Sequence, residues 1–95
     1  MGKTHNLKTW PDVFQACADG RKTFEYRRDD RGFEIGDRLI LYHFDPVTQR
    51  SSGEFLSFDI TYIVRGGIFG IPEGYCIMSI LPAEDGTQCF SQSKE

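Results

Sequence analysis

Hydrophobic and polar residues alternate over several short stretches of this chain, which is the period of half-buried strands. The first stretch, residues 4–8, places His5 and Leu7 on one face and Asn6 and Lys8 on the other. We therefore expect a short strand near the N-terminus.

A second alternating stretch begins at Thr23. It places Phe24 and Tyr26 on one face and Thr23, Glu25 and Arg27 on the other. This pattern predicts a half-buried strand on which Glu25 and Arg27 share the polar face.

Three further strands are expected in the second half of the chain. Residues 38–44 form an apolar run, which is typical of a central strand covered on both faces. Residues 75–81 form the last strand, which Pro82 ends. In residues 54–64 one face is expected to carry Leu56, Phe58, Ile60, Tyr62 and Val64.

A helix is predicted between the first two strands. Thr9 is a suitable N-cap, Pro11 suits the first turn, and Gly20 is placed to end the helix. The apolar stripe of this helix consists of Val13, Phe14, Ala16 and Cys17.

The order of these elements defines the expected fold class. Five strands with one main helix after the first strand, without regular alternation of strand and helix, predict an α+β fold with a small mixed β-barrel. The length of 95 residues allows one domain, expected over residues 1–84. A polar tail, residues 85–95, is expected to be mobile.

Between the last two strands, residues 65–74 hold four glycines and one proline and form an expected loop. Its apolar tip residues, Ile68 and Phe69, would serve as a lid or a rim.

Charge is distributed unevenly along the chain. The net charge of −3 argues against holding long duplexes by phosphate neutralisation alone. Residues 1–31 nevertheless carry seven Lys and Arg against five Asp and Glu, whereas residues 32–95 carry four against nine. An anionic ligand is therefore expected near the basic residues Lys8, Arg21, Lys22, Arg27, Arg28 and Arg31.

Cysteine and histidine usage indicates no metal site and no cofactor. The three cysteines lack Cys-x-x-Cys spacing and are expected to be reduced thiols. His5 and His43 have no second ligand at a spacing that would build a metal site on one element. Without a signal segment or an apolar run of about 20 residues, we expect a cytoplasmic protein that does not enter membranes.

The chemistry of the chain is concentrated in residues 20–27, where Lys22 precedes Glu25 and Arg27. From the residues alone, two interpretations stand. Glu25 and Arg27 form a surface ion pair beside a solvated Lys22, or the three line a site for a phosphate, a carboxylate or a nucleobase edge.

These residues resemble a known signature. Gly20, Lys22, Glu25 and Arg27 fill the fixed positions of the Gly-x-Lys-x-x-Glu-x-Arg motif of ASCH domains, which belong to the PUA-like superfamily. The segments 5–8 and 33–37 extend the similarity to a small phage and bacterial ASCH-like family of unknown function, over roughly residues 4–81. The resemblance implies a PUA-like pseudobarrel that binds RNA, or acts on modified nucleobases, in a cleft between helix and barrel.

The expected ligand-binding residues combine this resemblance with the basic segment: Lys22, Glu25, Arg27, His5, Lys8, Arg28 and Tyr26. Lys22 and Glu25 are the candidate catalytic pair. Trp10 either staples the helix to the core, which the sequence favours, or stacks on a base.

Our leading hypothesis is binding of RNA or a nucleotide-like ligand. The first alternative is a hydrolase acting on RNA or a modified nucleobase or nucleoside. Glu25, however, replaces a Thr that amidohydrolase relatives use, so the resemblance does not carry that activity over. The second alternative is a phage-type protein-interaction module whose partner contacts the tip of the 65–74 loop.

Overall fold

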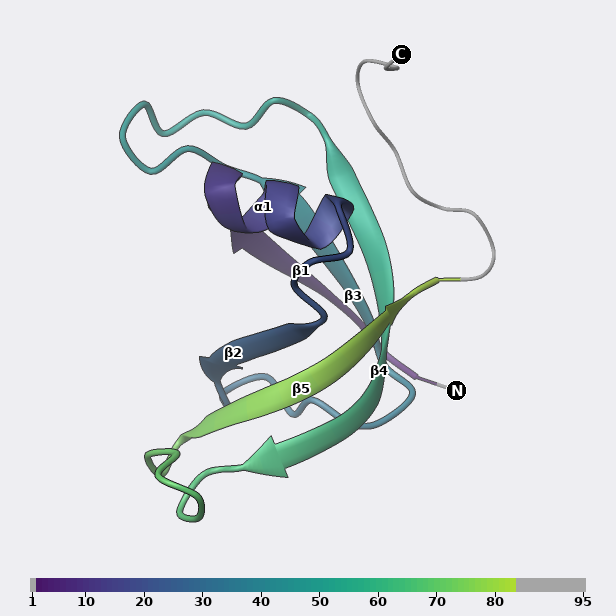
Figure 1. Cartoon of the computed structure of the whole chain (residues 1–95), viewed down its shortest axis with the longest axis vertical. Helices are drawn as coiled ribbons and strands as arrows, with labels where there is room; N and C mark the ends of the chain where they lie inside the picture. Colours follow the sequence, from purple (N-terminus) through teal and green to yellow (C-terminus); the bar gives the residue numbers. More distant parts are fainter. Residues whose placement is uncertain (1, 84–95) are drawn as a thin grey trace.

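A computed structural model describes residues 2–83. The chain forms one five-stranded sheet that curls into a half-barrel, with one short helix against its inner face (Figure 1). The elements, in chain order, are β1 (Thr4–Thr9), α1 (Pro11–Ala18), β2 (Phe24–Arg28), β3 (Arg38–His43), β4 (Phe55–Arg65) and β5 (Tyr75–Pro82).

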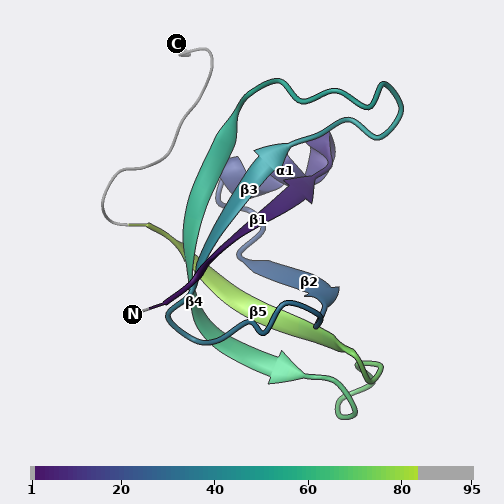
Figure 2. The same ribbon diagram turned by 180° about the vertical axis from the view of Figure 1, so that it is seen from behind.

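The sheet is mixed, with strand order β1-β3-β4-β5-β2. β1 pairs with β3 in parallel, and the other three pairings are antiparallel. β1 and β2 are therefore the two edge strands, and the curl of the sheet brings them to face one another across a seam (Figure 2). This confirms the expected α+β class with a mixed, barrel-like sheet.

The core fills the concave side of the sheet. β1 contributes Leu7, and α1 contributes Phe14 and Cys17. The other core residues are Phe33, Leu39, Leu41, Leu56, Phe58, Ile60, Cys76, Met78 and Ile80. Burial of this apolar surface is the main favourable term for folding.

β3 lies inside the sheet, as expected, but it is not buried on both faces. Leu39 and Leu41 are fully buried on the concave side, whereas Ile40 and Tyr42 are half-buried on the other. α1 lies against the concave face, since Phe14 contacts the ring of His43 from that side.

β2 has the reverse orientation to the expected one. Its aromatic face points outward, with Phe24 46% and Tyr26 47% exposed, while Glu25 is only 2% exposed. The strand alternates as predicted, but its polar side chains point inward because they pair with one another there.

β4 departs from simple alternation at Thr61. A bulge shifts the register with β5 between Ile60 and Tyr62. An extra residue in one strand reverses which side chains point inward. Tyr62 is therefore exposed, and Ile63 packs against the core in its place.

The predicted N-cap of α1 is wrong. Thr9 ends β1, where its hydroxyl donates to the Leu7 carbonyl, and Trp10 is the N-cap residue without a side-chain capping bond. Pro11 does occupy the first turn, as expected.

The predicted end of α1 is confirmed. Gly20 has φ 81°, its N–H donates to the Cys17 carbonyl (3.2 Å), and the N–H of Arg21 donates to the Ala16 carbonyl (2.9 Å). This is a Schellman motif, in which glycine adopts the left-handed conformation without steric cost.

In residues 2–83, no helix has the length and hydrophobicity needed to cross a bilayer. The predicted mobile tail, residues 85–95, lies outside the described residues.

We predict that Gly20→Ala lowers the free energy of unfolding by about 1 kcal/mol, because a Cβ disfavours the left-handed conformation. Space is not limiting, since a Cβ at Gly20 would meet no atom within 4 Å. Urea unfolding measures the difference. Gly20→Asn is the matched control and should cost less, because asparagine tolerates this conformation. Equal costs for both variants would contradict this account.

Candidate functional site

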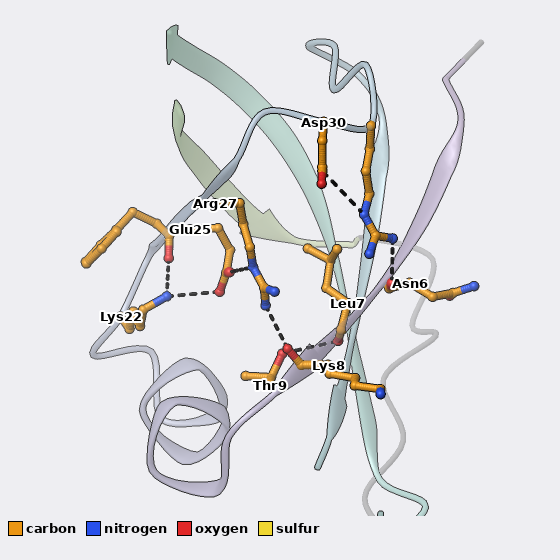
Figure 3. Close-up of polar contacts among 10 residues, drawn as sticks. Asn6, Leu7, Lys8, Thr9, Lys22, Glu25, Arg27 and Asp30 are labelled. Carbon is orange, nitrogen blue, oxygen red and sulfur yellow. Dashed lines mark hydrogen bonds and ion pairs between the residues drawn. The ribbon is translucent and has the colours of Figure 1, made fainter. Parts of the chain in front are cut away.

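The candidate site is organised around the buried carboxylate of Glu25. Nζ of Lys22 lies 2.9 Å from its Oε2, and Nε of Arg27 donates to its Oε1 over 2.8 Å (Figure 3). A carboxylate removed from water needs such partners, because burying it unpaired would cost several kcal/mol. The expectation of a surface ion pair beside a solvated lysine is therefore wrong, whereas the expected grouping of Lys22, Glu25 and Arg27 is found.

Lys22 is held in place by the backbone around it. The Schellman motif ends α1 two residues earlier and turns the chain toward β2. Nζ of Lys22 also donates to the Phe24 carbonyl (2.6 Å) and lies 4.6 Å from the centroid of the Phe24 ring. These contacts within the chain fix the position of the ammonium.

Arg27 crosses the seam between the two edge strands. Its Nη2 donates to the Lys8 carbonyl on β1 (2.9 Å), while its Nε stays on Glu25 (Figure 3). Farther along the seam, Nη1 of Arg31 donates to the Asn6 carbonyl (3.0 Å). Side chains thus connect β1 and β2 where these strands do not pair.

A cleft of about 530 Å³ opens beside this cluster, between the end of β1, α1 and β2. Its lining consists of Lys8, Thr9, Trp10, Val13, Lys22, Glu25, Tyr26 and Arg27. Three cations and one carboxylate give the lining a net positive charge, and the cleft is open to solvent. Such a surface suits an anionic ligand that carries a flat ring.

Trp10 and Tyr26 provide the aromatic part of the cleft. The prediction that Trp10 staples the helix to the core is wrong, because its side chain is 61% exposed at the cleft. Trp10 is the N-cap residue of α1 and makes no side-chain capping hydrogen bond. Tyr26 borders the cleft from β2, where we expected it.

The remaining predicted cations take different positions. Lys8 belongs to the cleft lining, but its side chain points away from the Glu25 cluster (Figure 3), and its Nζ lies 4.6 Å from the centroid of the Phe44 ring. Arg28 points to the outer face of β2, where its guanidinium carbon lies 5.3 Å from the centroid of the Tyr75 ring. Arg28 is therefore outside the cleft lining.

His5 is also outside the cleft, contrary to expectation. Its side chain is 7% exposed, its Nε2 lies 2.8 Å from Oδ2 of Asp37, and its ring meets Phe33 edge-on. His5 faces the core at the far end of β1 from Lys8, so it holds β1 to the turn that precedes β3.

Asp37, which the sequence did not single out, is the second buried carboxylate. Burial opposes its ionisation, but hydrogen bonds from His5 and from the backbone N–H groups of Lys3 and Glu34 outweigh this and lower its pKa. This cluster is structural, because it does not line the cleft.

Cys17 lies behind the ion-paired cluster, on the core side of α1. Burial raises the pKa of its thiol, Lys22 and Arg27 act in the opposite direction, and Glu25 adds to the rise. Cys17 is thus a neutral core residue and not a nucleophile.

Among residues 2–83, no group of three or more His, Cys, Asp or Glu side chains could hold a metal ion. Nδ1 of His43 is buried without a hydrogen-bond partner, and its ring packs edge-on against Phe14.

The fold and this cleft define a small α+β domain whose half-barrel seam carries ion-paired and aromatic residues. Residues 4–80 match the family described as "Domain of unknown function (DUF3850)", so the chain belongs to that family.

The chain is also similar to the "Uncharacterized 12.9 kDa protein in GpA 3'region" of Escherichia phage P2, with 40% identity over 42 residues. This similarity covers 44% of the chain and 38% of the phage protein. It agrees with the expected relation to a phage family of unknown function.

We predict that Arg27→Ala lowers the free energy of unfolding by roughly 2–3 kcal/mol, because hydrogen bonds that involve charged groups contribute about this much. The substitution leaves one oxygen of Glu25 and the Lys8 carbonyl without their donors. Chemical denaturation measures the loss.

The control for this variant is Arg21→Ala. Arg21 pairs with Asp19, but both side chains are well exposed, so its loss should cost less than about 1 kcal/mol. Similar losses at positions 21 and 27 would show that the seam contacts do not stabilise the fold.

The Asp37 cluster predicts a pH dependence. The pKa of Asp37 is lower in the folded state than in the unfolded state, so its contribution is fully present above the unfolded value of about 4 and is lost as the pH falls through the folded value. Denaturation of wild type and Asp37→Asn should therefore show a stability difference that is large at neutral pH and shrinks in acid. A difference that is constant with pH would contradict this.

Proposed function

We propose that this chain is an ASCH-type, PUA-like domain that binds single-stranded RNA or a nucleotide-like ligand in the cleft. The observation that carries the proposal is the composition of the cleft, whose lining combines the basic residues Lys8, Lys22 and Arg27 with the exposed aromatic residues Trp10 and Tyr26. Cations contact phosphates, and aromatic rings stack on bases of any sequence.

The position of the signature residues supports the ASCH part of the proposal. Lys22, Glu25 and Arg27 line a cleft between the helix and the barrel-like sheet, which is where the ASCH resemblance expects the ligand. The fourth residue, Gly20, acts through the backbone, since it ends α1 and directs the chain to Lys22.

Lys22 and Arg27 keep donors for a ligand in addition to their contacts with Glu25. An ammonium carries three donors and a guanidinium five. The bonds described above use two of each. The spare donors suit a phosphate oxygen or a base edge.

Binding is a better account of this geometry than hydrolysis. Nζ of Lys22 donates to Glu25 and to the Phe24 carbonyl, so these two contacts fix its position, as suits an anchor for a ligand. The cleft is also open, whereas hydrolysis of a single nucleobase favours a site that excludes water.

The single tryptophan of the chain makes the proposal directly testable, because the tryptophan fluorescence comes from Trp10 in the cleft lining. We predict that short oligouridylate changes this fluorescence saturably at low salt. Lys8→Ala should weaken binding and reduce the slope of log K against log salt by about 0.7, the value for one lost phosphate contact on a single strand.

Lys8 is preferred to Lys22 for this test because only its backbone takes part in the seam. The matched control is Lys3→Ala, which removes one positive charge at the other end of β1 and should leave binding unchanged. Uridine monophosphate, tested in parallel, separates a nucleotide site from an RNA site. No saturable change with either ligand, for a folded protein at low salt, would remove the proposal.

A further inference from the structure

The outward face of β2 and β5 is a second surface rich in aromatic residues. The register of the two strands places Phe24 beside Ser79, Tyr26 beside Ile77, and Arg28 beside Tyr75. Side chains on one face of neighbouring strands lie close enough to form a continuous surface. Phe24 and Tyr26 are about half exposed on it.

Three side chains on this face are already ordered against one another. The rings of Tyr26 and Tyr75 stack with their centroids 5.5 Å apart and their planes at 19°. The guanidinium of Arg28 lies against the same Tyr75 ring. Together, Tyr26, Tyr75 and Arg28 form what we call the outer ladder.

The outer ladder is continuous with the cleft. Tyr26 belongs to both, since it lines the cleft and stacks on Tyr75. Lys22 also connects the two surfaces, because its Nζ contacts Glu25 in the cleft and the Phe24 ring beside the ladder. A ligand that leaves the cleft past Tyr26 therefore meets further aromatic and cationic groups.

The charge of this face favours a polyanion. The outward positions of β2 hold Phe24, Tyr26 and Arg28. Those of β5 include no Asp or Glu; they hold Tyr75, Ile77, Ser79 and Leu81. A second copy of the chain would fit less well, because a two-fold contact centred here would bring Arg28 and Lys22 of one copy close to Arg28 or Lys22 of the other.

We propose that single-stranded RNA longer than the cleft continues over the outer face of β2 and β5, with bases stacked at Tyr26 and Phe24 and a phosphate at Arg28. This inference rests on the proposed function, and it adds the surface outside the cleft that a longer RNA would cover. A volume of about 530 Å³ is that of a site for one small ligand, so additional nucleotides must lie on a neighbouring surface.

The test compares labelled oligouridylates of about three and about ten nucleotides. The first is shorter than known single-strand binding sites, which cover about 4–16 nucleotides, and the second lies within that range. We predict that wild type binds the longer oligonucleotide more tightly. Phe24→Leu should weaken binding of the longer oligonucleotide by roughly fivefold or more, the effect of one lost stacking partner. Arg28→Ala should also weaken it, by removing one phosphate contact, and both variants should leave the shorter oligonucleotide unchanged.

Two control variants match these changes. Tyr62→Leu removes an exposed ring from the same row of the sheet as Phe24, but on β4, two strands away, and should have no effect on either oligonucleotide. Lys3→Ala removes a charge from a residue that belongs neither to the ladder nor to the cleft lining. Phe24→Leu keeps an apolar side chain beside Lys22, so the cleft itself is preserved.

The outcomes separate the footprint from the proposed function. Equal affinity for both lengths, or equal weakening of both by Phe24→Leu and Arg28→Ala, would overturn the proposed path of the RNA over the outer face of β2 and β5. Binding in the cleft would remain as proposed. Failure of both oligonucleotides to bind would overturn both. Unchanged RNA affinity together with dimerisation that Phe24→Leu abolishes, measured by sedimentation equilibrium, would assign the face to a second copy of the chain.

Discussion

The buried carboxylate of Glu25 is the point on which the rest of this structure depends. Left unpaired in the interior, it would cost several kcal/mol. Lys22 approaches it from the end of α1, and Arg27 from its own strand, so that both oxygens are paired. Since Arg27 also binds the Lys8 carbonyl, one ionised group connects the helix end, β2 and β1. The cost of burying charge is thus offset by contacts that join three elements.

Arginine side chains also occupy the β1 edge of the half-barrel, where the sheet ends. An exposed edge strand presents unpaired backbone groups and invites pairing with another chain. Here the β1 edge is capped by arginines, which bind the carbonyls of Asn6 and Lys8. The two carbonyls are two residues apart and therefore point to the same side of the strand. The guanidinium groups of Arg27 and Arg31 thus bind edge carbonyls that a sixth strand would otherwise pair with. The cleft lies beside Arg27, at the end of β1.

Much of the fold was predictable, because the alternation of residues along a strand and the residues that end a helix are local features of the sequence. Alternation located the strands, and Gly20 located the helix end. Alternation does not say which face is buried, and the preference of aromatic residues for the interior gave the wrong answer for β2. The orientation of Glu25 depends on partners that only the folded chain assembles, and the bulge at Thr61 depends on the pairing of β4 with β5. For the same reason the sequence placed His5 in the site and did not single out its partner, Asp37.

The site itself shows two kinds of residue that the sequence motif does not separate. Lys22 and Arg27 are held by Glu25 within the fold, so under the proposed function they would lose little conformational entropy on binding a ligand. Lys8 and Trp10 lie outside the motif; both belong to the cleft lining, and neither side chain joins the Glu25 cluster. Under the proposed function, the motif therefore marks the scaffold of the site, and the residues beside it determine how well a ligand binds. A chain that keeps the motif but loses the cation at position 8 and the ring at position 10 would keep this fold and lose most of its affinity for RNA.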